Sequence, residues 1–210
     1  MRVYLIDKPD APQSEVRIGY PALARSTPDY FPVVVMNRML GGQFTSRVNL
    51  NLREKHGFTY GAFTSFRFQK GIGPFVAQGG IVSEKTDSAL VEFIAEINLM
   101  KEKGMSPEEL EYAKKGMVGN FALSFETNAQ IAGSLQNIVL YGLPEDYYRN
   151  YLVNIEGVKL DEVQRVAKQY LDASTMAVVV VGDLAKIRDQ IAALKLGELV
   201  TCDPDGKPLP

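Results

Sequence analysis

Alternation of apolar and polar residues predicts strands near the start of the chain and a long hairpin in its first half. The pattern runs over Val3–Ile6, Glu15–Tyr20 and Phe58–Gln69, with the period of two that is typical of strands. A glycine-rich turn at 71–73 follows and leads into an expected partner strand, Phe75–Val82. Because one face of the 58–69 strand is apolar and the other polar, we expect a sheet with one covered and one exposed face.

Apolar residues at helical spacing predict helices over most of the remaining chain. The first is expected to begin in the segment Ser26-Thr27-Pro28-Asp29, which offers a hydroxyl cap, an early proline and an acid, and to run to Leu40. A capping box from Ser106 to Glu109 opens a long helix. The other expected helices are Thr45–Lys55, Asp87–Lys103, Ala129–Tyr141, Glu145–Asn154, Leu160–Leu171 and Leu184–Leu194.

Two late strands complete the expected sheet. Met176–Val181 is a continuous apolar run, interpreted as a fully buried strand, and Glu198–Cys202 is interpreted as a short edge strand. No linker or internal repeat divides the sequence. A strand-rich first part, a helix-rich second part and a late return to the sheet indicate one α+β domain over residues 1–210, with a mixed or antiparallel sheet covered by helices.

The composition is that of an ordinary globular domain. The 210 residues are 46% hydrophobic and 23% charged, which suffices for one core. A net charge of −2 without a Lys/Arg cluster argues against nucleic-acid binding. No apolar run approaches the roughly 20 residues of a membrane span, and the first residues lack the pattern of a signal peptide. The compartment stays open between cytoplasm and periplasm, and so does the choice between a fragment and a complete subunit.

A zinc or nucleophile site contained in this chain is not expected. Zinc takes three or four His, Cys or carboxylate ligands, whereas the chain has one histidine, His56, and one cysteine, Cys202, and contains neither HExxH nor HxxEH. A Ser-His-Asp or Cys-His arrangement would require the same histidine. His56 is interpreted as a solvated residue at a helix end and Cys202 as a structural residue.

Two further features receive structural interpretations. The carboxylates of Glu108, Glu109 and Glu111 lie in a first helical turn, where they stabilise the helix dipole. The pair Gly41-Gly42 lacks the Lys-Ser/Thr ending of a phosphate-binding loop and is interpreted as a sharp turn between helices.

The remaining candidate site combines Arg53 and Tyr60. Arg53 ends a predicted helix and Tyr60, seven positions later (60 − 53), lies near the start of the following strand. A guanidinium and a phenol are both hydrogen-bond donors and could hold a peptide carbonyl or stabilise an oxyanion. The pattern also allows a structural interpretation, in which Tyr60 lies on the apolar face of its strand and Arg53 forms a surface ion pair near Glu54.

At these residues the chain resembles the C-terminal homology domain of the M16, or insulinase-type (pitrilysin), zinc peptidases. The segment LGGQFTSRVNLNLREKHGFTY is similar to the family pattern LGGG-x-SSRL-x-x-x-LREExGxxY. Weaker similarity covers nearly the whole chain, including SPEELEYAKKGMVGNF and AVVVVGD. Gln43 stands where the family commonly has a third glycine, and Lys55-His56 also depart from it.

The resemblance implies a LuxS/MPP-like metallohydrolase fold and a two-part enzyme. In the family one domain or subunit carries HxxEH and binds zinc, and its partner carries an Arg/Tyr pair that reaches the substrate main chain. The matching positions here are Arg53 and Tyr60. The resemblance therefore implies that this chain binds no metal or cofactor itself, that zinc lies in a partner domain or subunit, and that the chain is not active alone.

Three functions remain open from the sequence. The leading one is the non-zinc half of a metalloendopeptidase that hydrolyses peptides. The second is a structural subunit, similar to the core proteins of the respiratory bc1 complex. The third is a peptide-binding module that does not catalyse.

Overall fold

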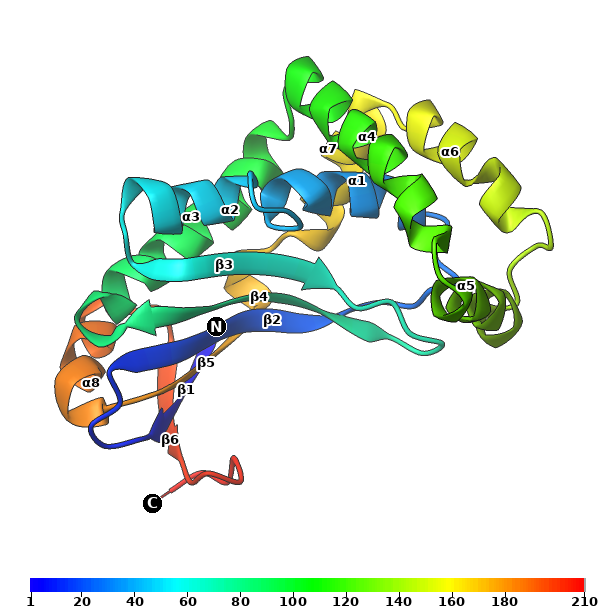
Figure 1. Ribbon diagram of the computed structural model, residues 1–210. Coiled ribbons are helices and arrows are strands. Elements are labelled where there is room, and N and C mark those ends of the chain that lie inside the picture. Colours follow the sequence, from blue (N-terminus) through cyan, green and yellow to red (C-terminus); the bar gives the residue numbers. More distant parts are fainter. Residues whose placement is uncertain (210) are drawn as a thin grey trace.

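A computed structural model describes residues 1–209, which form a six-stranded mixed sheet with helices packed against one face (Figure 1). The strand order is β3-β4-β2-β5-β1-β6. The pairs β1–β5 and β1–β6 are parallel, and the other three are antiparallel. The strands are β1 (Arg2–Asp7), β2 (Gln13–Leu23), β3 (Thr59–Phe66), β4 (Gly73–Val82), β5 (Ala177–Gly182) and β6 (Glu198–Cys202). The expected α+β class with a mixed sheet is confirmed.

The helices form two layers above the sheet (Figure 1). Helices α1 and α3 lie next to the strands, and α4, α6 and α7 pack over α1. The helices are α1 (Tyr30–Leu40), α2 (Arg47–Asn49), α3 (Thr86–Lys103), α4 (Pro107–Phe121), α5 (Asn128–Tyr141), α6 (Tyr147–Gly157), α7 (Leu160–Tyr170) and α8 (Leu184–Ala193). Shorter turns are the π-helix η1 (Leu50–Lys55) and the 3₁₀ segments η2 (Ser83–Lys85), η3 (Ala122–Phe125) and η4 (Ala173–Thr175). Every helix predicted from the sequence is present.

The core lies between the sheet and the inner helices. Burying each large apolar side chain there contributes about 1.5–3 kcal/mol. The fully buried residues on the strands and inner helices include Leu5, Ile18, Phe75, Ile81, Met36, Leu40, Leu90, Phe93, Ile97 and Met100.

The apolar strand β5 is buried on one face only, so the expectation of full burial is wrong. Val178 and Val180 are completely buried, whereas Val179 and Val181 are partly exposed. The reason is visible in Figure 1, where the helices gather on one side of the sheet. β5 is nevertheless central, with β1 and β2 hydrogen-bonded on its two sides. Valine suits such a site because its branched side chain packs well on a half-covered pleated surface.

Helix α5 stands apart from the other helices (Figure 1). It begins with a capping box formed by Thr127 and Gln130, yet none of its residues is buried. It exposes the apolar side chains of Ile131, Leu135, Val139 and Leu140. Its last residue contacts the β3–β4 hairpin, where the hydroxyl of Tyr141 donates to the Phe68 carbonyl at 3.4 Å.

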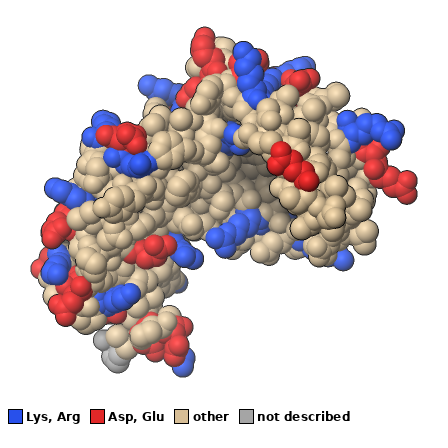
Figure 2. Space-filling view, in the orientation of Figure 1, with Lys and Arg blue, Asp and Glu red and all other residues tan. Residues whose placement is uncertain are grey.

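Basic and acidic side chains are interspersed on the face seen in Figure 2, without a patch of one sign. Among residues 1–209, no helix has the length and apolar character needed to cross a membrane.

Candidate functional site

Arg53 lies in a wide helical turn. The α2 helix continues directly into the π-helix η1, and the main-chain N–H of His56 donates to the Asn51 carbonyl at 3.1 Å. Gly57, with φ of +66°, ends the helix, and its N–H donates to the Arg53 carbonyl at 3.0 Å. A left-handed glycine is the usual helix end of this kind. Isolated π turns occur frequently at functional sites.

The guanidinium of Arg53 is held against an aromatic ring and remains accessible. Its central carbon lies 4.5 Å from the centroid of the Phe44 ring, a cation–π contact. Its Nη1 lies 3.5 Å from Oε1 of Glu54, which agrees with the surface ion pair considered above. One third of the Arg53 side chain is exposed, so donors are left for a group from outside the chain.

Phe44 lies outside the core. It is 57% exposed, although Val48 and Leu52, four and eight positions later, are buried. The helix begins only after Ser46. Phe44 therefore precedes the helix, and its ring faces Arg53 instead of the core.

Tyr60 departs from its predicted place, because β3 contains a bulge. In the register with β4, Thr59 pairs with Ile81 and Ala62 pairs with Gly79, so two residues of β3 lie opposite one of β4. Thr59 and Ala62 are both buried, and Tyr60 is 88% exposed. The extra residue breaks the alternation and turns Tyr60 away from the apolar face.

A buried asparagine connects the helix of Arg53 to the strand of Tyr60. Asn49 is 0% exposed. Its side-chain oxygen accepts from the Ala62 N–H at 3.0 Å, and its amide donates to the Phe44 carbonyl at 2.7 Å. The bulge is closed by Thr59, whose hydroxyl accepts from the Gly61 N–H at 3.0 Å and donates to the Gly80 carbonyl at 2.8 Å. Asn49 is not among the residues predicted from the sequence, although an asparagine inside a helix often bonds to main-chain groups nearby.

The turn at Gly41-Gly42 also contacts the strand that carries Tyr60. The Gly41 carbonyl accepts from the Thr64 N–H at 3.0 Å. A Cβ added at Gly41 would lie 2.4 Å from the Thr64 nitrogen, so the two segments could not approach this closely with any other residue. Asn37 on α1 reinforces the contact, since its side chain accepts from the Thr64 hydroxyl at 2.7 Å and donates to the Thr64 carbonyl at 3.1 Å. The pair forms a turn, as interpreted from the sequence, and it also permits a close approach to β3 that was not predicted.

The first helical turn of α4 holds the start of the Arg53 helix. The guanidinium of Arg47 donates through Nε to Glu109 at 2.7 Å and through Nη2 to both Glu109 and the Gly104 carbonyl, the latter at 2.9 Å. Glu109 also accepts from the Ser106 N–H at 2.8 Å, while the Ser106 hydroxyl accepts from the Glu109 N–H. The structural interpretation of Glu108 and Glu109 is supported, and Glu109 has a second partner that the sequence did not reveal.

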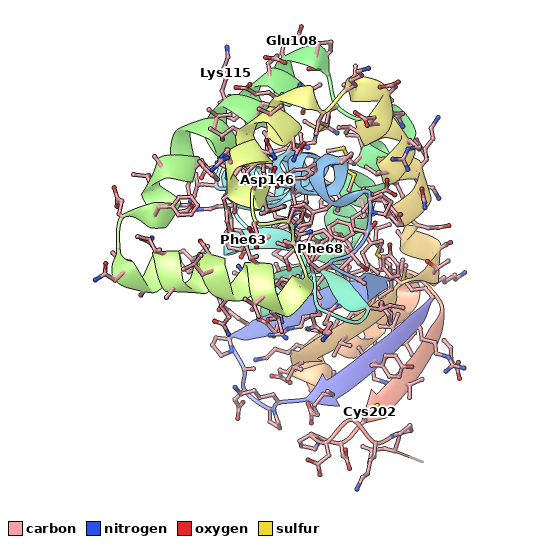
Figure 3. The ribbon with its side chains drawn as sticks, turned by 90° about the vertical axis from the view of Figure 1, so that its right-hand side faces the viewer. Phe63, Phe68, Glu108, Lys115, Asp146 and Cys202 are labelled. Atoms are coloured by element: carbon pink, nitrogen blue, oxygen red, sulfur yellow. The ribbon has the colours of Figure 1, made fainter. Side chains whose placement is uncertain are left out.

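His56 and Cys202 lie far from one another. His56 is not a solvated residue as predicted, because only 27% of its side chain is exposed, its ring stacks on Phe58 at 4.8 Å, and its Nε2 lies 3.7 Å from Glu92. Cys202 is buried in β6, and Figure 3 shows it well separated from Phe63 on β3. Within residues 1–209, no three His, Cys, Asp or Glu side chains are arranged to hold a metal ion.

The site therefore presents two donors on a fixed backbone. Among the described residues, the Tyr60 hydroxyl has no hydrogen-bond partner, and no hydrogen bond joins it to Arg53. The buried groups beneath them, centred on Asn49, restrict the main chain that carries both. Such an arrangement suits the recognition of an acceptor, for example a peptide carbonyl, that comes from another molecule or domain.

Comparison with known proteins gives consistent results. Residues 1–117 match the family model described as the peptidase M16 inactive domain. Two curated relatives are an "uncharacterized zinc protease YmxG" from Bacillus subtilis and a "non-peptidase homolog YmxG" from Helicobacter pylori. The first is 27% identical over 168 residues, covering 79% of this chain and 40% of the relative. The second is 28% identical over 155 residues, covering 72% of this chain and 35% of the relative.

A solved structure supports the same family assignment. The peptidase M16 inactive domain from Pseudomonas fluorescens superimposes with a TM-score of 0.80 at 26% identity, over 87% of this chain and 43% of that one. The chain thus spans less than half the length of each of these three proteins.

Proposed function

Since the chain belongs to the M16 peptidase family as a domain of the inactive type, we propose that it is the substrate-binding half of a two-part peptidase. In this proposal Arg53 and Tyr60 donate hydrogen bonds to the main chain of a peptide held at the zinc site of a partner. The partner is an HxxEH-bearing domain or subunit of the same family. This chain supplies no metal ligand.

The observation that supports the proposal most directly is the position of Tyr60. A tyrosine side chain 88% exposed on a strand buries little of its ring and gains little hydrophobic stabilisation there. The backbone beneath it is held by Asn49 and Thr59 through hydrogen bonds of 2.8–3.0 Å. A rigid support under an unpartnered donor favours binding over a role in folding.

The chemistry of the two donors fits a developing oxyanion. Bound zinc in the partner would activate water and polarise the peptide carbonyl. The Arg53 guanidinium is always charged and presents N–H groups in a plane, while Tyr60 offers one directional O–H. Both would strengthen their hydrogen bonds as negative charge accumulates on the carbonyl oxygen.

The test is peptide cleavage by the assembled enzyme. The chain is combined with an HxxEH-bearing partner domain, and kcat is measured for Arg53→Ala and Tyr60→Phe. Removing one oxyanion donor lowers kcat by about 100-fold. Matched controls are Arg188→Ala on α8 and Tyr4→Phe on β1, which remove the same groups elsewhere. Unchanged turnover in both site variants, with intact assembly, contradicts the catalytic role.

A second candidate function is a non-catalytic structural subunit. It is favoured by the description of the Helicobacter pylori relative as a non-peptidase homolog. In that case the chain would be found in a stable complex that contains no zinc-bearing homologue. The peptide-binding module would instead bind peptide tightly through Arg53 and Tyr60 without any partner. Isolation of the native complex, and a binding assay on the chain alone with Arg53→Ala and Tyr60→Phe as controls, separate the three functions.

A further inference from the structure

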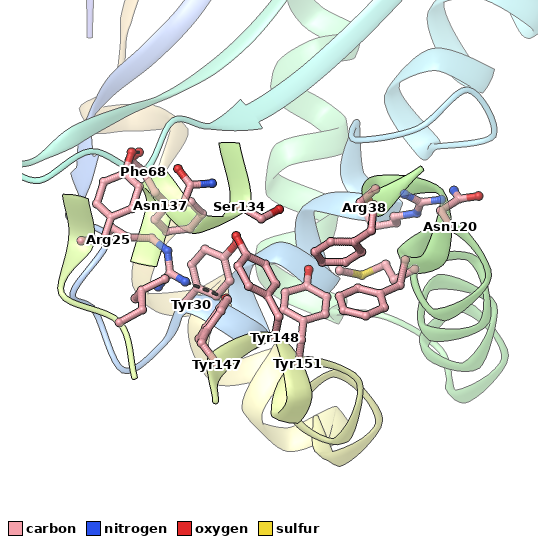
Figure 4. A pocket seen from close by; sticks show the side chains of 16 residues that line it. Arg25, Tyr30, Arg38, Phe68, Asn120, Ser134, Asn137, Tyr147, Tyr148 and Tyr151 are labelled. Carbon is pink, nitrogen blue, oxygen red and sulfur yellow. Dashed lines mark hydrogen bonds between the residues drawn. The ribbon is translucent and has the colours of Figure 1, made fainter. Parts of the chain in front are cut away.

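A cavity of about 540 Å³ lies between α1, α4, α5 and α6, and none of its lining residues belongs to the Arg53–Tyr60 site (Figure 4). Volumes of this size are typical of small-ligand sites. Figure 2 shows this face of the molecule hollowed beneath the outer helices. The proposed function above makes no use of this space.

The walls of the cavity are aromatic. Tyr30, Tyr147, Tyr148 and Tyr151 project into the space shown in Figure 4. Phe121 also lines the cavity. The rings of Phe121 and Tyr151 stack with centroids 5.1 Å apart and planes at 11°. Rings packed against one another in this way form a rigid surface for an apolar or aromatic group.

The charged residues that line the cavity are two arginines, and no carboxylate is among the lining residues. Arg25 is already engaged: its central carbon lies 3.6 Å from the Tyr30 ring centroid, and its Nη2 donates to the Tyr147 hydroxyl at 2.6 Å. Arg38 differs, because its Nε is buried and has no hydrogen-bond partner among residues 1–209. A half-buried guanidinium whose buried Nε has no partner is expected to bind an anion.

The tyrosines do not neutralise these cations. Burial raises the pKa of Tyr151 to about 12 and raises the pKa of Tyr147 further, so both phenols stay protonated near neutral pH. They act as hydrogen-bond donors and acceptors, and the cavity keeps its positive charge.

A glycine on α4 makes room for Arg38. A Cβ at Gly116 would lie 3.1 Å from Nη2 and 3.6 Å from Nε of Arg38. Glycine inside a helix costs about 1 kcal/mol relative to alanine, so its place here has a packing reason. The guanidinium lies directly on the α4 backbone at the end of the cavity where Figure 4 shows Asn120.

We propose that this cavity binds the carboxyl-terminal end of a peptide whose last residue is aromatic or large and aliphatic. The terminal carboxylate pairs with the Arg38 guanidinium, the last side chain lies among the rings of Tyr148, Tyr151 and Phe121, and the amides of Asn120 and Asn137 meet the peptide main chain. A ligand with one carboxylate next to a large apolar side chain matches a cavity with one unpaired guanidinium surrounded by aromatic rings. A phosphate group would be better served by several cations or a row of main-chain N–H groups.

Peptides with free carboxyl-terminal ends would be produced by the proposed peptidase itself, so this inference extends the proposed function and rests on it. Peptide hydrolysis breaks the C–N bond, adds water across it and leaves a new carboxylate on one product. A cavity that retains this end would hold a cleaved or partly cleaved peptide near the enzyme.

The experiment uses the purified chain alone and fluorescence anisotropy of Ala-Ala-Ala-Phe labelled at its amino end. The free acid is expected to bind, and the same peptide with a carboxamide end at least about tenfold more weakly, because a charged hydrogen bond is lost. Arg38→Gln is expected to weaken the acid by a similar factor, and Arg188→Gln, which removes an arginine on α8, is expected to leave it unchanged. Arg38→Met, which keeps most of the apolar stem and removes the charge, is a second variant if Arg38→Gln does not fold.

Several results would overturn the proposal. They are equal binding of the acid and the amide, binding of the acid that is unchanged in Arg38→Gln or Arg38→Met, and no binding of either peptide. N-acetylphenylalanine that competes as well as the whole peptide would show that the ligand is a small carboxylic acid instead. Arg53→Ala and Tyr60→Phe are expected to leave this binding intact, so loss of the proposed catalytic role and loss of the cavity's role are read in separate assays.

Discussion

The side-chain oxygen of Asn49 accepts a hydrogen bond from the main-chain N–H of Ala62 at 3.0 Å. Thirteen positions separate the two residues, and between them lie both Arg53 and Tyr60. The bond closes the helix, the Gly57 turn and the bulge of β3 into one ring of connected backbone. The relative placement of the two candidate site residues therefore depends on a residue that touches neither.

Replacing Asn49 should affect both stability and the site. Asn49→Ala leaves the Ala62 N–H and the Phe44 carbonyl without their partner, which costs about 1–3 kcal/mol in the free energy of unfolding. Urea unfolding measures this loss, and Asn154→Ala on the exposed face of α6 is the matched control. In the assembled enzyme the same variant should lower kcat. A stability equal to that of the wild type would show that the bond has no net value.

Alanine substitutions at Gly41 and at Gly133 should have opposite effects on stability. Gly41→Ala should destabilise the protein by at least about 1–3 kcal/mol, because the new Cβ would lie 2.4 Å from the nitrogen and the hydroxyl of Thr64. Gly133→Ala should stabilise it by about 0.5–1 kcal/mol, because Gly133 lies inside α5 and no atom lies within 4 Å of the added carbon. Thermal unfolding measures both, and effects of the same sign would contradict the close approach at Gly41.

The carboxylate of Asp29 should make stability depend on acid pH. Arg165 donates to it at 2.6 and 3.2 Å and Tyr170 at 2.6 Å, and these bonds lower its pKa below the usual 3.8. A lowered pKa stabilises the fold above the unfolded-state pKa, and this contribution is lost as the pH falls through the folded-state pKa. The free energy of unfolding should therefore begin to fall as the pH approaches the unfolded-state value near 3.8 and should continue to fall below it.

Asp29→Asn tests this pH dependence. The variant should be less stable at neutral pH and should lose less stability on acidification, measured by urea unfolding at a series of pH values. The dependence becomes shallower without vanishing, because the Ser174 hydroxyl similarly lowers the pKa of Asp172. Asp189→Asn on α8 is the control. An identical slope in Asp29→Asn and wild type would contradict the assignment.

Glu109 has two roles, and its removal should cost more than the loss of the cap alone. Ser106→Ala removes the cap of α4 and costs about 1 kcal/mol. Glu109→Ala removes the other half of the capping box and also leaves the partly buried Arg47 without its carboxylate, which adds about 1.5–3 kcal/mol. Denaturant unfolding of the two variants, with Glu111→Ala as the control, measures the difference. Equal losses would mean that the Arg47 contact contributes nothing.

Local patterns were sufficient to predict the elements of this fold. The capping box at Ser106, the helix ends at Gly41, Gly57 and Gly104, and the hairpin glycines at 71–73 are signals carried by a few neighbouring residues. The α+β class follows from their order. Half-burial of β5 was not predicted, because a run of valines suits a strand covered on either one or both faces.

The details of the site depend on contacts between distant segments. The bulge that exposes Tyr60 is a mismatch in length between β3 and β4, and the exposure of Phe44 depends on where the helix begins after Ser46. The arginines and tyrosines of the cavity are distributed from Arg25 to Tyr151 and meet only through the packing of four helices. No periodicity within one segment carries this information.

Because of the bulge in β3, neighbouring residues of one strand are either packed in the core or free of it. The side chains of Ala62 and Thr64 must fit the packed interior, whereas the side chain of Tyr60 lies in solvent and, among residues 1–209, packs against no core residue. Substitutions at the packing positions of the strand can therefore leave the orientation of the phenol unchanged. A deletion of one residue between Asn49 and Tyr60 could be absorbed by loss of the bulge, which would place Tyr60 opposite Ile81 and turn it inward. We therefore expect the length of this segment to tolerate change less well than its composition.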